Sequence, residues 1–276
     1  MADTALEDEG SFRIADALVA KPLAWAETSP APSQTPVLSF VKFRAFDRAL
    51  KGYRSIVQLL KAGQWEDAIA LARSLYELNI NLSAIVASPD PERGAKKFVR
   101  FGKLQRLRLE QRRLKDRHRD EKLKSPASAR AITECEQGLS RIASTLNNDF
   151  ADFRKPKSKG WLESWSESNV EALAQRLAKE TGGLSGQSDY YVFALASLYA
   201  HNSPGAMFLP LPQDRETEDW KDFRAALDDA GRRGLRNFLY EASICLVDIV
   251  GMTGDSITGY EKEWFDQFAI PLLEQL

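Results

Sequence analysis

The chain has 276 residues, of which 43% are hydrophobic and 28% charged, and its formal net charge is −1. A chain of this length buries roughly three quarters of its unfolded surface, so a stable core requires neither disulfides nor metals. The balanced charge indicates no particular class of partner, and the two isolated cysteines, Cys135 and Cys245, lack zinc-type spacing and favour a reducing compartment.

The beginning of the chain, MADTALEDEG, is acidic and has no basic segment followed by an apolar run, so it does not resemble a signal peptide. The longest apolar stretches are shorter than the ~20 residues that a membrane span needs. Motifs typical of nucleotide-binding loops, zinc proteases and serine hydrolases are absent. We therefore expect a cytoplasmic protein with no membrane partner, no cofactor and no metal site.

Residues 1–38 are expected to be peripheral or flexible, with one or two helical turns between Phe12 and Ala20 and a proline-rich linker at 29–36. Residues 39–276 are expected to form a single helical domain. A helix over 38–62 is predicted by apolar residues at three- and four-residue spacing, and Gly63 is expected to end it.

The next predicted helix, Glu66–Ala87, is apolar almost all the way round, which is typical of a helix buried in a core. Arg73, Glu77 and Asn81 nevertheless recur every four residues along it, so they form a polar line on one face. A buried arginine needs a partner, and Glu77 lies one helical turn away.

Residues 93–124 contain fourteen Lys and Arg but only four Asp and Glu, an excess of +10. The rest of the chain therefore sums to −11, so the charge is strongly polarised. A thin apolar stripe predicts a long, mostly solvated helix here, and a returning helix follows from Ala129. We expect residues 93–150 to be an inserted, projecting basic helical hairpin.

Two more stretches are predicted to be buried helices, Tyr190–His201 and Leu235–Met252, the latter preceded by a separate amphipathic helix over 217–230. No segment shows the alternating pattern of a strand. The predicted fold class is all-α, a multi-helix bundle with the projecting basic hairpin.

Five polar residues lie on helices that otherwise read as core: Arg73, Glu77, Ser197, His201 and Glu241. Buried polar groups must be hydrogen-bonded or each costs ~1–3 kcal/mol, so we expect a shared polar network. One interpretation is a structural network that sets helix register; the other is a small-molecule enzyme site with His201 and Glu77 as catalytic groups.

The Arg73-x-x-x-Glu77 helix, a Trp-Leu-x-Ser-Trp segment and the Ser197-x-x-x-His201 helix together resemble a bacterial all-helical family catalogued only as a domain of unknown function. The resemblance covers roughly residues 40–250. It implies an all-α fold and groups these four residues, but it implies no activity.

The basic helix is a candidate surface for nucleic acid or another partner, through Arg100, Arg106, Arg108, Arg112, Arg113, Arg117 and Arg119. Aromatic residues that could stack on bases are few, with Phe98 and Phe101 at one end. Arg113 and His118 are spaced in a way that resembles the HEPN ribonucleases, although that family usually has a polar residue where Leu114 stands. An arginine at this distance from a histidine is also expected by chance in so basic a run.

From the sequence we favour a non-enzymatic interaction or regulatory module that binds an acidic protein partner, or a second copy of itself, through the basic hairpin. The alternative is an RNA-binding protein or HEPN-like ribonuclease of a defence or toxin system.

Overall fold

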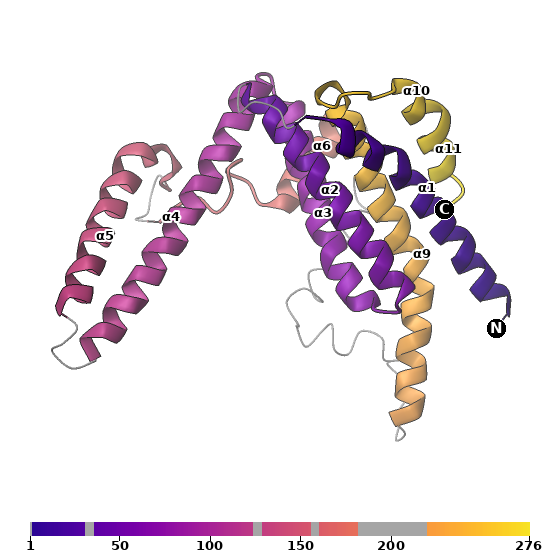
Figure 1. The fold of residues 1–276 in the computed structure, drawn as a ribbon, viewed down its shortest axis with the longest axis horizontal. Helices are drawn as coiled ribbons and strands as arrows, with labels where there is room; N and C mark the ends of the chain where they lie inside the picture. Colours follow the sequence, from indigo (N-terminus) through magenta and orange to yellow (C-terminus); the bar gives the residue numbers. More distant parts are fainter. Residues whose placement is uncertain (1, 31–35, 124–128, 156–159, 182–219) are drawn as a thin grey trace. The chain divides into compact units, whose positions relative to one another are not determined.

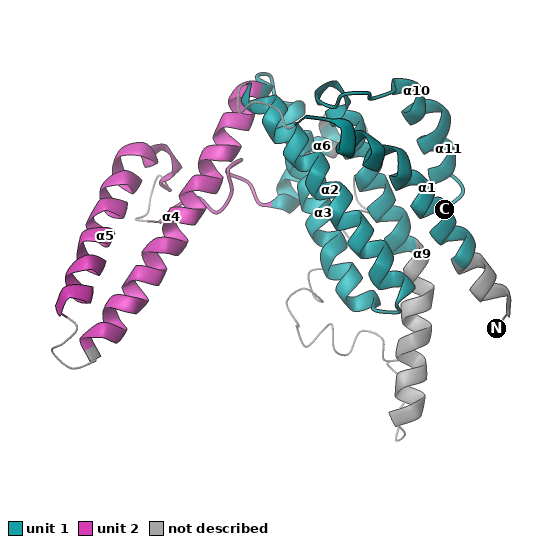
Figure 2. Ribbon diagram, in the orientation of Figure 1, with its two compact units in different colours: residues 1–91, 170–276 teal, residues 92–169 magenta. Residues whose placement is uncertain are grey.

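The computed structural model of the chain describes residues 2–30, 36–123, 129–155, 160–181 and 220–276. These residues are mainly helical, which confirms the predicted all-α class (Figure 1). Their contacts divide the chain into two compact units, residues 1–91 with 170–276, and residues 92–169 (Figure 2). Among the described residues, no helix is both long enough and apolar enough to cross a membrane.

The core of the first unit is formed by α2 (Val37–Lys61), α3 (Trp65–Val86) and α9 (Trp220–Thr253), which pack against one another pairwise. The apolar residues of α2 recur at the predicted helical spacing, and Phe46, Tyr53 and Ile56 are fully buried. Gly63 has a φ of 72°, and its amide donates to the Leu60 carbonyl. The expected helix end at this glycine is therefore confirmed.

The N-terminal segment forms α1 (Ala2–Thr28), which is longer than the one or two turns that the sequence indicated. It packs against α2 and α9, and its Leu18 and Trp25 are buried. The Trp25 ring meets the edges of Tyr260 and Trp264, each with ring centroids 5.2 Å apart. These apolar contacts explain why an acidic segment remains helical against the bundle.

The C-terminal part of the first unit also differs in detail from the prediction. One helix, α9, spans the region in which two were expected. A short turn, η3 (Gly254–Ser256), then leads to α10 (Lys262–Trp264), a π-helical turn η4 (Phe265–Ala269) and α11 (Ile270–Leu273). Another helix of this unit, α6 (Val170–Thr181), packs against α3. The predicted helix Tyr190–His201 lies outside the described residues.

The second unit contains the predicted basic hairpin, formed by α4 (Pro91–Leu123) and α5 (Ala129–Asp149). The short helix η2 (Ala151–Phe153) and the segment that follows complete the unit. Figure 2 shows this unit in magenta.

Candidate functional site

The two hairpin helices are held together by a narrow apolar seam. Leu104 on α4 and Cys135 on α5 are fully buried, and Ile142 and Leu146 on α5 are nearly so. At Gly138 an added Cβ would lie 2.9 Å from Leu114 Cδ1, so this glycine lets the two helices approach closely. Because the seam is thin, most of the surface of α4 remains available to solvent.

Aromatic rings close the base of the hairpin. Phe101 packs against Phe153 with centroids 5.7 Å apart, and Phe98 meets the edge of Trp165 at the same separation. Both phenylalanines are therefore engaged in packing within this unit. The aromatic residues that the sequence suggested for base stacking are used for the core instead.

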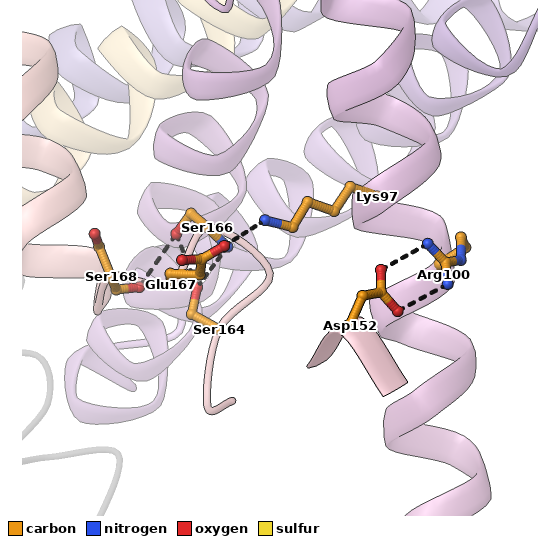
Figure 3. Close-up of polar contacts among 7 residues, drawn as sticks. All are labelled: Lys97, Arg100, Asp152, Ser164, Ser166, Glu167 and Ser168. Atoms are coloured by element: carbon orange, nitrogen blue, oxygen red, sulfur yellow. Dashed lines mark hydrogen bonds and ion pairs between the residues drawn. The ribbon is translucent and has the colours of Figure 1, made fainter. Parts of the chain in front are cut away.

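Arg100 on α4 is also engaged within the unit (Figure 3). Its two terminal nitrogens bind the Asp152 carboxylate at 2.9 and 3.0 Å, and one of them also donates to the Asp149 carbonyl at 2.7 Å. Its guanidinium lies over the Phe150 and Phe153 rings, 5.9 and 5.3 Å from their centroids. With carboxylate, carbonyl and ring partners, Arg100 stabilises the base of the hairpin.

A turn beyond α5 positions an indole next to α4. Arg154 and Trp161 form an isolated antiparallel bridge, and the Leu162 amide donates to the Phe153 carbonyl at 2.9 Å. The Arg154 guanidinium lies 3.7 Å from the centre of the Trp161 ring. This cation–π contact and the backbone bonds together fix the orientation of the indole.

Trp161 and one face of α4 enclose a groove of about 610 Å³, which we call the Arg108 groove. Three cations spaced by four and three residues, Arg108, Arg112 and Lys115, bring their side chains to it because this spacing places them on one helix face. The remaining lining consists of uncharged side chains: Gln105, Leu109, Gln111 and Trp161. Leu109 is 63% exposed, so the groove offers apolar as well as cationic surface.

The described lining of the groove contains three cations and no acid, so its surface is electropositive. The pKa of the nearby Glu163 carboxyl is lowered chiefly by a hydrogen bond from Lys155 and by the charge of Lys155, and the charge of Arg108 adds a smaller effect of the same sign. Arg112 and Lys115, in contrast, have no carboxylate within ion-pair distance in the described part of the chain. Carboxylates or phosphates of a bound partner could form ion pairs with these two cations.

The sequence profile of a family of unknown function, DUF5677, matches residues 40–216, more than half of the chain. The chain belongs to DUF5677. The predicted resemblance to a helical family of unknown function is thereby confirmed. No curated protein and no solved structure matches the chain significantly.

The DUF5677 match includes the whole basic hairpin. The other arginines that the sequence suggested for binding lie on several faces of α4. Arg113 pairs with Glu110 at 3.0 Å, and Arg119 lies 3.5 Å from Asp116. Arg106 and Arg117 are exposed. Of the seven arginines that the sequence suggested for binding, Arg108 and Arg112 line the groove and the other five do not.

The pair proposed for ribonuclease chemistry is engaged in two separate contacts. His118 Nε2 lies 3.2 Å from Glu136 Oε1 on α5, whereas Arg113 contacts Glu110 on α4 itself. Residues five apart on a helix are rotated by about 140° from each other, which keeps the two side chains apart within one hairpin. Ribonuclease activity in this DUF5677 protein stays a prediction.

Only three of the five residues of the predicted polar network lie within the described part of the chain. Arg73 and Glu77 form the expected ion pair at 3.2 Å, with side chains that are 20% and 38% exposed, so they border solvent instead of being enclosed. Glu241 on α9 is half-buried, and Ser197 and His201 lie outside the described residues. The grouping of these five residues, and an enzyme site at His201 and Glu77, stay predictions.

A fully enclosed polar contact in the described part of the first unit lies elsewhere. Tyr53 on α2 lies 2.8 Å from Ser243 on α9, and both residues have no exposed surface. Burial raises the pKa of the Tyr53 hydroxyl well above its usual value. Sequence analysis missed Ser243, because a single serine on an apolar helix carries no distinguishing pattern.

Proposed function

We propose that this DUF5677 protein is a non-enzymatic interaction module, and that the Arg108 groove binds an acidic segment of a partner protein. The observation that carries the proposal is the meeting of Arg108, Arg112 and Lys115 with Trp161 in one groove. Clusters of arginine recognise acidic peptide motifs, and Arg and Trp are the residue types that dominate binding energy at protein interfaces.

The chemical character of the groove lining supports a peptide as the ligand. Exposed Leu109 and the Trp161 ring offer apolar contact, while Gln105 and Gln111 can both donate and accept hydrogen bonds. A segment that alternates acidic and small apolar side chains would match both kinds of surface. A second copy of the chain is another source of acids, because the chain outside residues 93–124 sums to −11.

The experiment is a fluorescence anisotropy titration of the full chain into two labelled peptides, one alternating Glu and Ala, the other alternating Gln and Ala. We expect saturable binding of the glutamate peptide that weakens as salt is raised, and no binding of the glutamine peptide. Equal affinity for the two peptides, or no binding of either at low salt, would rule out an acidic partner. Sedimentation of the chain alone tests self-association.

A second candidate is single-stranded RNA, and the specific observation in its favour is the indole in the groove. A tryptophan beside a row of cations is the arrangement that stacks a base while the cations contact the phosphates. Titration of a labelled uridine homopolymer tests it. If RNA binds, Trp161→Ala should weaken binding by about 1–3 kcal/mol, whereas Trp161→Phe should keep most of it.

A further inference from the structure

Another groove, of about 320 Å³, is lined by α2 and α3 of the first unit. We call it the Leu71 groove. The wall from α3 carries Leu71, Leu75 and Leu78, whose four- and three-residue spacing places them on one side of the helix. Leu75 is buried, whereas Leu71 is 37% exposed. The α3 wall therefore offers leucine side chains to a molecule that enters the groove.

The opposite wall comes from α2 and is cationic. Arg44, Arg48 and Lys51 lie along it, and Asp47 is the acid of the described lining, so the net charge is +2. Asp47 already has partners, since it lies 2.7 Å from Lys51 and 3.4 Å from Arg44. Arg48 is exposed and has no carboxylate within ion-pair distance in the described part of the chain. A ligand with carboxylates could form an ion pair with it.

Leucines on one wall and cations on the other suit an amphipathic helix as the ligand, because such a helix lays its apolar side into a groove between two helices. Acids beside that apolar side would meet the α2 wall. The wall extends from Arg44 to Ser55, about 16 Å along the helix axis at 1.5 Å per residue. A matching ligand therefore needs about three helical turns.

The C-terminal part of the first unit carries a helical face of this kind. Residues 262–273 are continuously helical, through α10, η4 and α11. Glu263, Asp266, Ile270 and Glu274 recur along this stretch at three- and four-residue spacing, and all four are exposed. We call these four residues the Ile270 face. Its length, about 16 Å, equals that of the α2 wall.

The charge of the Ile270 face is opposite to that of the groove. Residues 262–274 contain three acids and one lysine, a net charge of −2. The acids Glu263, Asp266 and Glu274 have no cation within ion-pair distance among the residues that the structure describes. Ile270, which is 37% exposed, lies between them. Opposite charges beside apolar side chains on both surfaces favour their association.

The two surfaces lie on different sides of the first unit. Figure 1 shows α10 and α11 on one side of α9, and α2 and α3 on the other. The Ile270 face of a chain therefore cannot enter the Leu71 groove of the same chain, whereas a second copy brings both surfaces.

We propose that two copies of the chain associate by placing the Ile270 face of each in the Leu71 groove of the other, as in the closed symmetric dimers that most oligomers form. This contact does not involve the Arg108 groove. The proposed self-association and the proposed binding of an acidic partner therefore stand or fall separately.

The test is sedimentation velocity of the full chain over a concentration series. We expect a reversible equilibrium of monomer and dimer with a dissociation constant on the order of micromolar, which rises as salt is added. A chain that remains monomeric up to its solubility limit would overturn the proposal.

Charge reversal assigns the contact to the two surfaces. R48E/K51E and E263K/D266K are each expected to raise the dissociation constant at least about tenfold, because like charges then face each other. The variant with all four substitutions reverses both surfaces together and is expected to return to within about threefold of wild type. An unchanged dissociation constant in either double variant, or no recovery in the combined variant, would overturn the proposal.

R13E/R54E is the matched control, since it makes the same change of net charge at two exposed positions outside the groove. Its dissociation constant should stay within about threefold of wild type, and a loss equal to that of R48E/K51E would contradict a specific contact. Leu71→Ser removes apolar contact without a change of charge and should also weaken the dimer. If R48E/K51E does not fold, Leu71→Ser decides.

A triple variant of α4, R108Q/R112Q/K115Q, separates this dimer from the Arg108 groove. It is expected to dimerise like the wild-type protein, because none of its three substitutions touches the Leu71 groove or the Ile270 face. Loss of the dimer in this variant would assign self-association to the Arg108 groove and overturn the contact proposed here.

Discussion

Tyr53 on α2 donates a hydrogen bond to Ser243 on α9 at 2.8 Å, because the Ser243 hydroxyl donates its own hydrogen bond to the Leu239 carbonyl at 2.7 Å. Both side chains are completely buried. The pair therefore forms a short satisfied chain of hydroxyl groups between two core helices, where an unpaired hydroxyl would be costly.

This assignment of donors predicts unequal effects for the two partners. Tyr53→Phe removes the donor but leaves Ser243 bonded to Leu239, so it should lower the free energy of unfolding by about 1 kcal/mol. Ser243→Ala leaves the Tyr53 hydroxyl buried without an acceptor and should cost about 1–3 kcal/mol. Urea denaturation measures both. The double variant should cost less than the sum of the two, and strict additivity would contradict the pairing.

The same hydroxyl predicts a pH dependence. Burial raises the pKa of Tyr53, so above pH ~10 the unfolded chain releases this proton while the folded protein keeps it. The unfolded state then binds fewer protons, and the free energy of unfolding must fall as pH rises, by about 1.4 kcal/mol per pH unit from this group.

Tyr53→Phe supplies the control for this pH dependence, since lysines and other tyrosines also titrate in that range. The stability of the variant, measured by urea denaturation at a series of alkaline pH values, should fall less steeply than that of the wild-type protein by the contribution of this one group. Parallel curves for the two proteins would show that Tyr53 ionises normally in the folded state.

Two glycines predict opposite responses to the same substitution. Neither has an atom within 4 Å of an added Cβ, so only the backbone matters. Gly52 lies inside α2, where alanine should raise the free energy of unfolding by about 0.5–1 kcal/mol. Gly63 has a φ of 72°, a conformation that disfavours a side chain, so alanine there should lower the free energy of unfolding by about 1–2 kcal/mol. Shifts of the same sign in thermal denaturation would refute this.

Two arginines of α4 are expected to have different roles. Arg100→Gln loses the Asp152 pair and the Asp149 carbonyl, and hydrogen exchange should become faster around residues 98–104 and 150–153. The variant should lower the free energy of unfolding by about 0.5–1 kcal/mol, a small amount because the Arg100–Asp152 ion pair is half-exposed. Binding of the glutamate peptide should change little.

Arg112→Gln removes an exposed side chain of the Arg108 groove, so it should weaken peptide binding and leave the packing of the hairpin unchanged. Its exchange rates should match those of the wild-type protein, and its affinity for the peptide should fall. If Arg100→Gln weakens binding more than Arg112→Gln while exchange is unchanged, the division of α4 into structural and binding arginines is incorrect.

Helical periodicity predicted α2, α3 and the hairpin because each has a continuous apolar stripe. It failed to distinguish the inner face of α3 from the outer one. The four-residue repeat of Arg73 and Glu77 lies on a face that reaches solvent, whereas Asn79, two residues further and so about 200° round the helix, is the buried polar group. A regular polar line is more typical of a solvent face, and a lone buried asparagine leaves no repeat to detect.

Other differences have similarly local causes. The sequence predicted two helices where α9 is one, and two glycines, Gly231 and Gly234, lie between the two predicted ranges. A glycine within a helix costs only about 1 kcal/mol, less than the packing of α9 provides. Sequence analysis did not single out Trp161 as a binding residue. Its place beside α4 depends on the turn that joins Arg154 to it, and a residue placed in this way cannot be predicted from spacing along one helix.

One face of α4 is the proposed site for an acidic partner, and the same helix provides a matched control. Arg108, Arg112 and Lys115 line the groove, whereas Lys103, Arg106 and Arg117 lie about 140–180° away from Arg108 on the same helix. Each set contains two arginines and one lysine. Glutamine replacement of either set removes the same charge and preserves helix propensity.

The measurement is the affinity of the glutamate peptide at ~0.15 M salt for the wild-type protein and the two triple variants. R108Q/R112Q/K115Q should bind at least about tenfold more weakly, since three lost ion pairs amount to ~1–3 kcal/mol. K103Q/R106Q/R117Q should remain within about threefold of wild type. Equal losses in the two variants would mean that only net charge matters, and would contradict a binding site in the groove.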